Sequence, residues 1–91
     1  MAEQRVLTFT VDGKKYKANP FDFEAFRLTN ENHADEAKKG AVTCGLDGVY
    51  HMFEGTDATN DVLAKASIHD MSDMCRKVWD WYVEELTSKN D

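Results

Sequence analysis

An Asp-Gly dipeptide near the N-terminus lies between two short segments in which residue polarity alternates. The first segment is 6–11 (VLTFTV) and the second is 14–18 (KKYKA), with Asp12 and Gly13 between them. Asp-Gly is favoured in type I′ turns because both central residues of that turn need positive φ angles. The pattern therefore predicts an antiparallel β-hairpin over residues 6–18.

The register of this hairpin follows from the polarity of its residues. A two-residue loop gives one mostly apolar face through three cross-strand pairs, namely Val11 with Lys14, Phe9 with Tyr16, and Leu7 with Ala18. A loop one residue longer would set Phe9 opposite Lys15 and mix the two faces. Because an isolated hairpin is only marginally stable, we expect the apolar face to pack on the rest of the chain.

Four helices are expected after the hairpin, which makes the chain one α+β domain over residues 1–86 with a polar tail at 87–91. The helices are expected at about 20–32, 41–54, 58–66 and 68–86, as a bundle that carries the hairpin. Asn19 is predicted to cap the first helix and Pro20 to occupy its first turn. The polar stretch 29–33 is expected to fray.

The second helix combines an apolar stripe with a row of small residues. Its stripe recurs at helical spacing through Val42, Leu46, Val49 and Phe53. Gly45 and Gly48 each cost a helix about 1 kcal/mol relative to alanine. A closely packed neighbour is therefore expected along this small-residue row, which consists of Ala41, Cys44, Gly45 and Gly48. The row is equally a candidate surface for self-association.

Composition excludes several classes of function. The 91 residues include 11 Lys and Arg and 17 Asp and Glu, a net charge of −6 that lies within residues 41–91. Such an acidic chain is a poor candidate for nucleic-acid binding, which depends on Lys and Arg at phosphates. No apolar run approaches the roughly 20 residues of a membrane span. The first residues lack the apolar segment of a signal peptide, so a cytoplasmic protein without membrane partners is expected.

Residues that could carry chemistry are sparse. The motifs of nucleotide-binding loops, zinc proteases and serine hydrolases are missing. Cys44, Asp47 and His51 fall along one side of a helix, but zinc normally needs three or four converging ligands, so this trio is a weak candidate. Cys44 and Cys75 are expected to be reduced thiols in the core. No catalytic, cofactor-binding or metal-binding residue is assigned.

The last helix contains the run Trp79-Asp80-Trp81-Tyr82. Adjacent residues on a helix point about 100° apart, so the three aromatic side chains cannot all enter one narrow core. Two interpretations remain open. The helix has a wide buried face, or one Trp is partly exposed at a protein interface, where Trp and Tyr are frequent anchors.

Four segments, in a fixed order, carry a resemblance to a known protein family. They are the hairpin 7–16 (LTFTVDGKKY), the aromatic helix start 19–26 (NPFDFEAF), the joint 53–59 (FEGTDAT) and the Trp-rich last helix. As a pattern covering nearly the whole chain, they resemble the small tail assembly chaperones of long-tailed phages and of prophages in Gram-positive bacteria. The resemblance implies a non-enzymatic protein of the bacterial host cytoplasm, without cofactors. Such a protein would bind the helical tape-measure protein, bring tail tube subunits to it, and self-associate as a homo-oligomer.

A client that is an extended amphipathic helix needs an apolar groove with an adaptable lining. The candidate protein-binding residues are Phe21, Phe23, Met74, Trp79 and Trp81. Two other classes stay open. One is a small prophage-encoded adaptor or regulator that binds another protein through the same aromatics. The other is an enzyme or metal protein built around the Cys44 trio.

Overall fold

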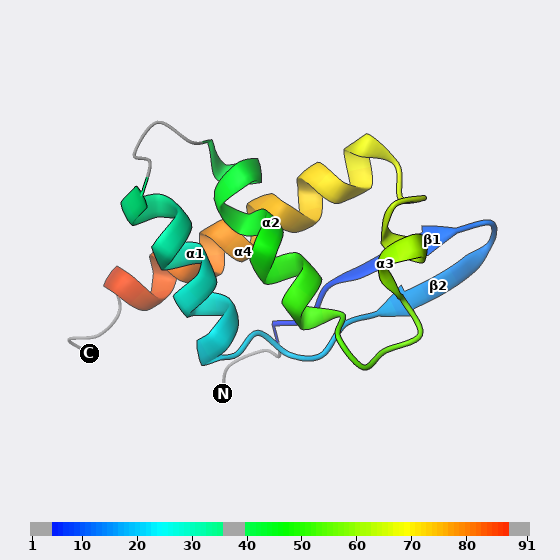
Figure 1. Cartoon of the computed structure of the whole chain (residues 1–91), viewed down its shortest axis with the longest axis horizontal. Helices are drawn as coiled ribbons and strands as arrows, with labels where there is room; N and C mark the ends of the chain where they lie inside the picture. Colours follow the sequence, from blue (N-terminus) through cyan, green and yellow to red (C-terminus); the bar gives the residue numbers. More distant parts are fainter. Residues whose placement is uncertain (1–4, 36–39, 88–91) are drawn as a thin grey trace.

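The chain folds into a two-stranded hairpin followed by four helices (Figure 1), which confirms the predicted α+β class. The computed structural model describes residues 5–35 and 40–87. Its elements are β1 (Thr8–Val11), β2 (Lys14–Lys17), α1 (Phe23–Asp35), α2 (Ala41–Met52), α3 (Asn60–Leu63) and α4 (Ile68–Thr87). Residues 88–91 of the predicted tail lie outside the described residues.

The hairpin has the predicted register and turn. β1 and β2 pair antiparallel, with Phe9 opposite Tyr16. Their rings stack with centroids 5.3 Å apart. Asp12 and Gly13 have φ angles of 53° and 80°, as a type I′ turn requires. The side-chain pattern of the two strands was therefore sufficient to determine their pairing.

One face of the hairpin packs against the helices, as expected. Leu7 and Phe9 are buried, and the ring of Phe9 meets that of Phe53 edge-on with centroids 5.3 Å apart. After β2, the backbone N–H of Asn19 donates to the carbonyl oxygen of Met52 at 2.9 Å. The hairpin is thus joined to the C-terminal end of α2, while the threonines and lysines of its other face are exposed.

α1 begins at Phe23 rather than at residue 20. Its N-terminal cap is Asp22, whose Oδ1 accepts a hydrogen bond from the backbone N–H of Ala25 at 2.9 Å. Asn19 instead donates its side-chain N–H to the carbonyl oxygen of Glu54 at 3.0 Å. The predicted cap at Asn19 was wrong because this residue is bonded to the end of α2, which keeps it outside the helix.

The polar end of α1 does not fray, contrary to the prediction. Thr29 is buried. Asn30 accepts a hydrogen bond from the hydroxyl of Tyr82 at 2.7 Å, and Asn32 donates to the carbonyl oxygen of Cys44 at 3.3 Å. These polar side chains bind α4 and α2, so tertiary partners hold a stretch that is a weak helix former by itself.

α2 packs against both α1 and α4, and its glycines permit the close approach. A Cβ atom at Gly45 would lie 2.3 Å from the carbonyl oxygen of Cys75, and one at Gly48 would lie 2.9 Å from Cγ1 of Val78. The predicted close packing along the small-residue row is confirmed. Because α4 occupies the row, this row is not an exposed surface for self-association.

The third predicted helix is much shorter than residues 58–66. α3 consists of Asn60–Leu63, and α4 starts soon after it at Ile68. Val42 was predicted to face the core, yet it is 36% exposed. It lines an open apolar hollow with Ile68 and Met71. Leu63, at the end of α3, lines the same hollow without closing it.

α4 is the longest element and has a wide inward face. Its fully buried side chains are Met74, Cys75, Val78 and Tyr82. Trp79 and Trp81 are half-buried beside this stripe. Tyr82 therefore belongs to the wide buried face of the helix, whereas each Trp keeps part of its surface in solvent. No helix among residues 5–35 and 40–87 is long and apolar enough to cross a membrane.

Candidate functional site

Three of the five predicted binding residues lie at one place. Phe21 and Trp81 pack together with ring centroids 5.6 Å apart, so Phe21 connects the start of α1 to the end of α4. Phe23 shares a groove with Phe21. Phe23 is 73% exposed, an unusually high exposure for a phenylalanine side chain.

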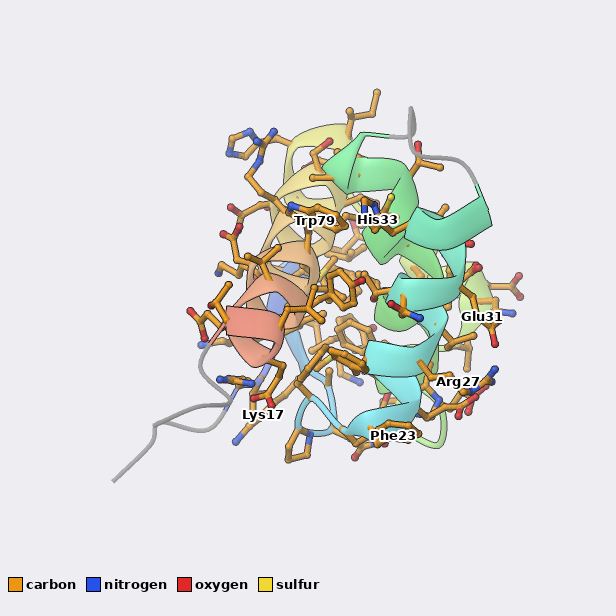
Figure 2. All side chains as sticks on the ribbon, turned by 90° about the vertical axis from the view of Figure 1, so that its left-hand side faces the viewer. Lys17, Phe23, Arg27, Glu31, His33 and Trp79 are labelled. Atoms are coloured by element: carbon orange, nitrogen blue, oxygen red, sulfur yellow. The ribbon has the colours of Figure 1, made fainter. Side chains whose placement is uncertain are left out.

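The other two predicted residues lie elsewhere. Trp79 packs on His33, with ring centroids 5.2 Å apart, near the other end of α1 (Figure 2). Met74 is 1% exposed. A binding residue has to be exposed, so the assignment of Met74 was wrong: this side chain faces inward from α4 and joins the hydrophobic core. Neither residue shares the groove that Phe21 and Phe23 form.

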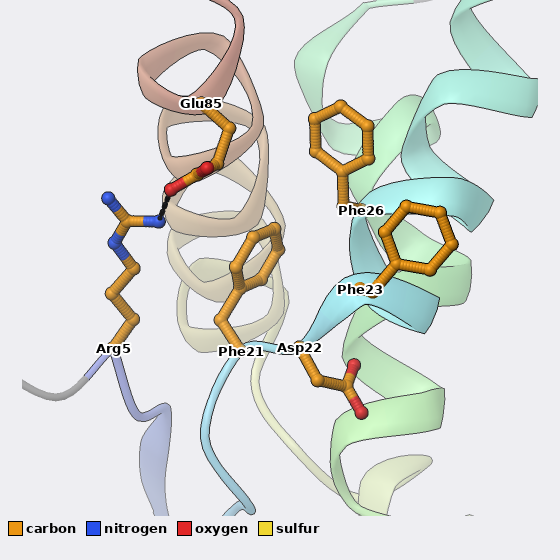
Figure 3. A pocket seen from close by; sticks show the side chains of 6 residues that line it. All are labelled: Arg5, Phe21, Asp22, Phe23, Phe26 and Glu85. Carbon is orange, nitrogen blue, oxygen red and sulfur yellow. Dashed lines mark hydrogen bonds and ion pairs between the residues drawn. The ribbon is translucent and has the colours of Figure 1, made fainter. Parts of the chain in front are cut away.

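The groove has a volume of about 430 Å³ and lies between the start of α1 and the C-terminal part of α4 (Figure 3). It is lined by Arg5, Phe21, Asp22, Phe23, Phe26 and Glu85. We refer to it as the Phe23 groove. Aromatic rings from one short segment supply its apolar surface, and charged groups border them.

The aromatic lining is held by contacts on both sides. The backbone N–H of Phe21 donates to the carbonyl oxygen of Arg5 at 2.8 Å, and the guanidinium carbon of Arg5 lies 6.0 Å from the centroid of the Phe21 ring. Phe26 packs on Tyr82 with ring centroids 5.0 Å apart. Two of the three rings are thus anchored, while Phe23 stacks only on Phe26, at 6.1 Å, among the described rings.

Three clusters of charge lie around the start of α1, each with one basic side chain between two carboxylates, and two of them include residues that line the groove. In the first, Arg5 bonds to Glu85 at 2.7 Å and to Glu84 at 3.1 Å. Figure 3 shows the Arg5–Glu85 pair at the side of the groove formed by α4. This cluster joins the residue before the hairpin to the last turns of α4 and keeps one excess negative charge.

The second cluster joins α1 to α2. Nε2 of His51 lies 3.0 Å from Oδ2 of Asp22, and Nδ1 lies 3.4 Å from Oε1 of Glu54. Burial by itself would lower the pKa of His51, but the hydrogen bond to Asp22 and the nearby carboxylates raise it above its usual value. For Asp22 the effects are reversed: burial by itself would raise the pKa of this carboxyl, but the hydrogen bonds from Ala25 and His51 lower it below its usual value.

The third cluster lies on α1 itself. Arg27 pairs with Glu24 and with Glu31, at i,i+3 and i,i+4 spacing. The hydrogen bond from Arg27 lowers the pKa of Glu24. Phe23 and Arg27 are also four residues apart, so they share one side of the helix. Figure 2 shows Phe23, Arg27 and Glu31 along this side.

The weak metal or thiol candidate is not assembled. Cys44 is buried, the side chain of Asp47 accepts a hydrogen bond from Asn32 at 3.2 Å, and His51 turns to Asp22. Among the described residues, no group of three potential ligands could hold a metal ion. Burial raises the pKa of Cys75 to about 11, so its thiolate is scarce near neutral pH.

The sequence did not indicate four lining residues of the groove, Arg5, Asp22, Phe26 and Glu85. Phe26 belongs to the same aromatic segment, and its spacing from Phe23 was a usable signal. Arg5 and Glu85 are 80 positions apart, and nothing in their sequence neighbourhoods indicates that they meet.

No family model matches this chain, and no curated protein or solved structure is significantly similar to it.

Proposed function

We propose that this chain is a non-enzymatic protein-binding module of the bacterial host cytoplasm, which uses the Phe23 groove to hold a client. The observation that carries the proposal is the 73% exposure of Phe23 beside the open groove. A large apolar side chain in this position loses water contact when a partner covers it, which is favourable. Aromatic side chains are also frequent anchors of protein interfaces.

The resemblance to small tail assembly chaperones supplies the class of client. A helical tape-measure protein would place one apolar stripe in the groove, and tail tube proteins would be brought to the complex. Helices bind grooves in this way through residues at i, i+3, i+4 and i+7. The groove lies between two helices, α1 and α4, and is open to solvent at Phe23, which suits an extended helical partner.

A second candidate function is an adaptor or regulator that joins two proteins. The hollow formed by Val42, Ile68 and Met71 shares no lining residue with the Phe23 groove. Ile68 is 87% exposed there. Two separate apolar surfaces would allow two partners to bind at once.

The client proposal is tested by co-purification. The chain is co-expressed with the long helical protein that the proposal expects in the same gene cluster. Phe23→Ala is expected to reduce recovery of that protein about tenfold, because truncating an interface anchor costs more than 1 kcal/mol. Ile68→Ala is the matched control and should leave recovery unchanged. Normal recovery with folded Phe23→Ala would show that the groove does not hold this client.

The adaptor function makes the opposite prediction for the second surface. If Ile68→Ala releases one partner and Phe23→Ala releases another, the chain joins two proteins. The chaperone proposal also expects an overlapping reading frame just downstream of this gene, followed by a gene for a very long helical protein. If both are missing, the chaperone proposal fails.

A further inference from the structure

We propose that the partner segment held by the Phe23 groove carries Lys or Arg beside its apolar anchor. This inference rests on the proposed function of the groove and adds the chemistry of what it selects. It follows from the exposed Phe23 ring that lines the groove and from the charges at its border.

The centre of the site is apolar and incompletely covered. Phe23 stacks on Phe26 with an interplanar angle of 23°, so one face of its ring is packed and much of the remainder is open. An apolar side chain of a partner would fill the groove beside this ring. A Lys or Arg next to that side chain could lie over the open ring, where cations are attracted.

The border of the site is acidic after its internal ion pairs are counted. Two clusters include lining residues of the groove: Arg5 lies between Glu84 and Glu85, and His51 lies between Asp22 and Glu54. Each cluster therefore keeps one carboxylate more than it has cations, even with His51 protonated. The carboxylates of these two clusters are 49% to 75% exposed, so a partner can reach them.

The cations at the border are already engaged. Arg5 is the cation among the described lining residues, and both of its terminal nitrogens contact carboxylates. An acidic partner would have to compete with these pairs and would meet the excess carboxylates. A basic partner would instead pair with the excess carboxylates and would not have to displace an existing ion pair. Such charge complementarity raises the association rate and disfavours acidic competitors.

Matched peptides test this inference. Two fluorescent helical peptides of about 18 residues, or five turns, carry the same Leu stripe. One has Lys beside the stripe and the other has Glu. The Lys peptide is expected to bind at least about tenfold more tightly in fluorescence anisotropy, and its advantage should shrink at about 0.5 M NaCl because exposed charges are screened.

Two variants separate the inference from the proposed function beneath it. Phe23→Ala should weaken the Lys peptide about tenfold, and Thr43→Ala, an exposed change on α2 outside both apolar hollows, should leave it unchanged. The double variant Glu84→Gln/Glu85→Gln should reduce the preference for Lys over Glu without abolishing binding.

The outcomes are distinguishable. If both peptides bind equally well and both depend on Phe23, the charge preference is wrong and the groove remains a binding site. If neither peptide binds, or if binding is insensitive to Phe23→Ala, the groove is not a docking site and the proposed function fails with the inference.

Discussion

At the scale of single residues, His51 has an unusual set of partners. Both of its ring nitrogens face carboxylates, Nε2 towards Asp22 and Nδ1 towards Glu54. A neutral imidazole has only one N–H, so it could donate to only one of them. The arrangement therefore favours the protonated ring, in agreement with the raised pKa of His51.

This raised pKa predicts a pH-dependent contribution to stability. Because the folded-state pKa lies above the unfolded one, the contribution is full below about pH 6.5 and is lost as pH rises through the folded value. Asp22 is 54% exposed, so the effect is limited to about 0.5–1 kcal/mol. His51→Gln should lower the free energy of urea unfolding by this amount near pH 5.5 and by much less near pH 8.5.

His69→Gln is the control for this measurement, because His69 is an exposed histidine on α4. An equal loss of stability by His51→Gln at both pH values would contradict the role of the protonated ring.

At the scale of elements, the start of α1 shows how tertiary contacts move a helix boundary. Asn19 and Pro20 are good residues for the start of a helix, yet α1 begins only at Phe23. The hydrogen bonds of Asn19 to Met52 and Glu54 hold it against α2. The shift matters for the site because it leaves Phe21 free of the helix and in contact with Trp81.

The new boundary makes Asp22 the cap of α1, which is testable. Asp22→Ala should lower the free energy of unfolding by about 1 kcal/mol, the usual cost of losing an N-cap side chain. Asp22→Asn keeps a capping oxygen and should lose less. Thermal unfolding followed by circular dichroism would measure both variants. Equal effects of the two substitutions would show that the charge of Asp22, rather than its cap, is what stabilises α1.

At the scale of the whole molecule, the position of α2 between α1 and α4 organises the core. Gly45 and Gly48 let the backbones approach, and the aromatic rings of α1 and α4 then meet at the groove. The elongated molecule, 42 Å in its longest dimension, carries the hairpin at one end (Figure 1). Self-association therefore requires a surface other than the small-residue row.

Substitution of Gly45 tests this packing. Gly45→Ala adds a helix-favouring residue worth about 1 kcal/mol, but the new methyl group would meet the backbone of α4 at 2.3 Å. We expect a net loss of about 2 kcal/mol or more in urea unfolding, because overpacking against a backbone cannot relax easily. Thr43→Ala, an exposed change in the same helix, should stay within about 0.5 kcal/mol. A Gly45→Ala protein as stable as the parent would show that α2 and α4 can separate at little cost.

Local patterns in the sequence were sufficient for the hairpin, its register, the helix order and the burial of both cysteines. Each of these depends on neighbours within a few positions: a turn dipeptide, a period of two, or a helical stripe. The aromatic segment 21–26 supplies three residues that line the Phe23 groove, two of which, Phe21 and Phe23, were predicted as binding residues. Val42 and Met74 were assigned to the wrong environments because a stripe indicates which residues share a face and not how far a neighbour covers it.

The Asp-Gly turn and the alternation around it determined how this chain begins, since pairing two adjacent strands requires no distant information. Only the tertiary structure decided where α1 starts, which aromatic rings remain open, and which charges surround them. Arg5 meets Glu85, Asp22 meets His51, and Asn30 meets Tyr82 across long stretches of chain. Such contacts depend on how the helices pack in three dimensions, so they cannot be predicted from the residues that flank each partner in the sequence.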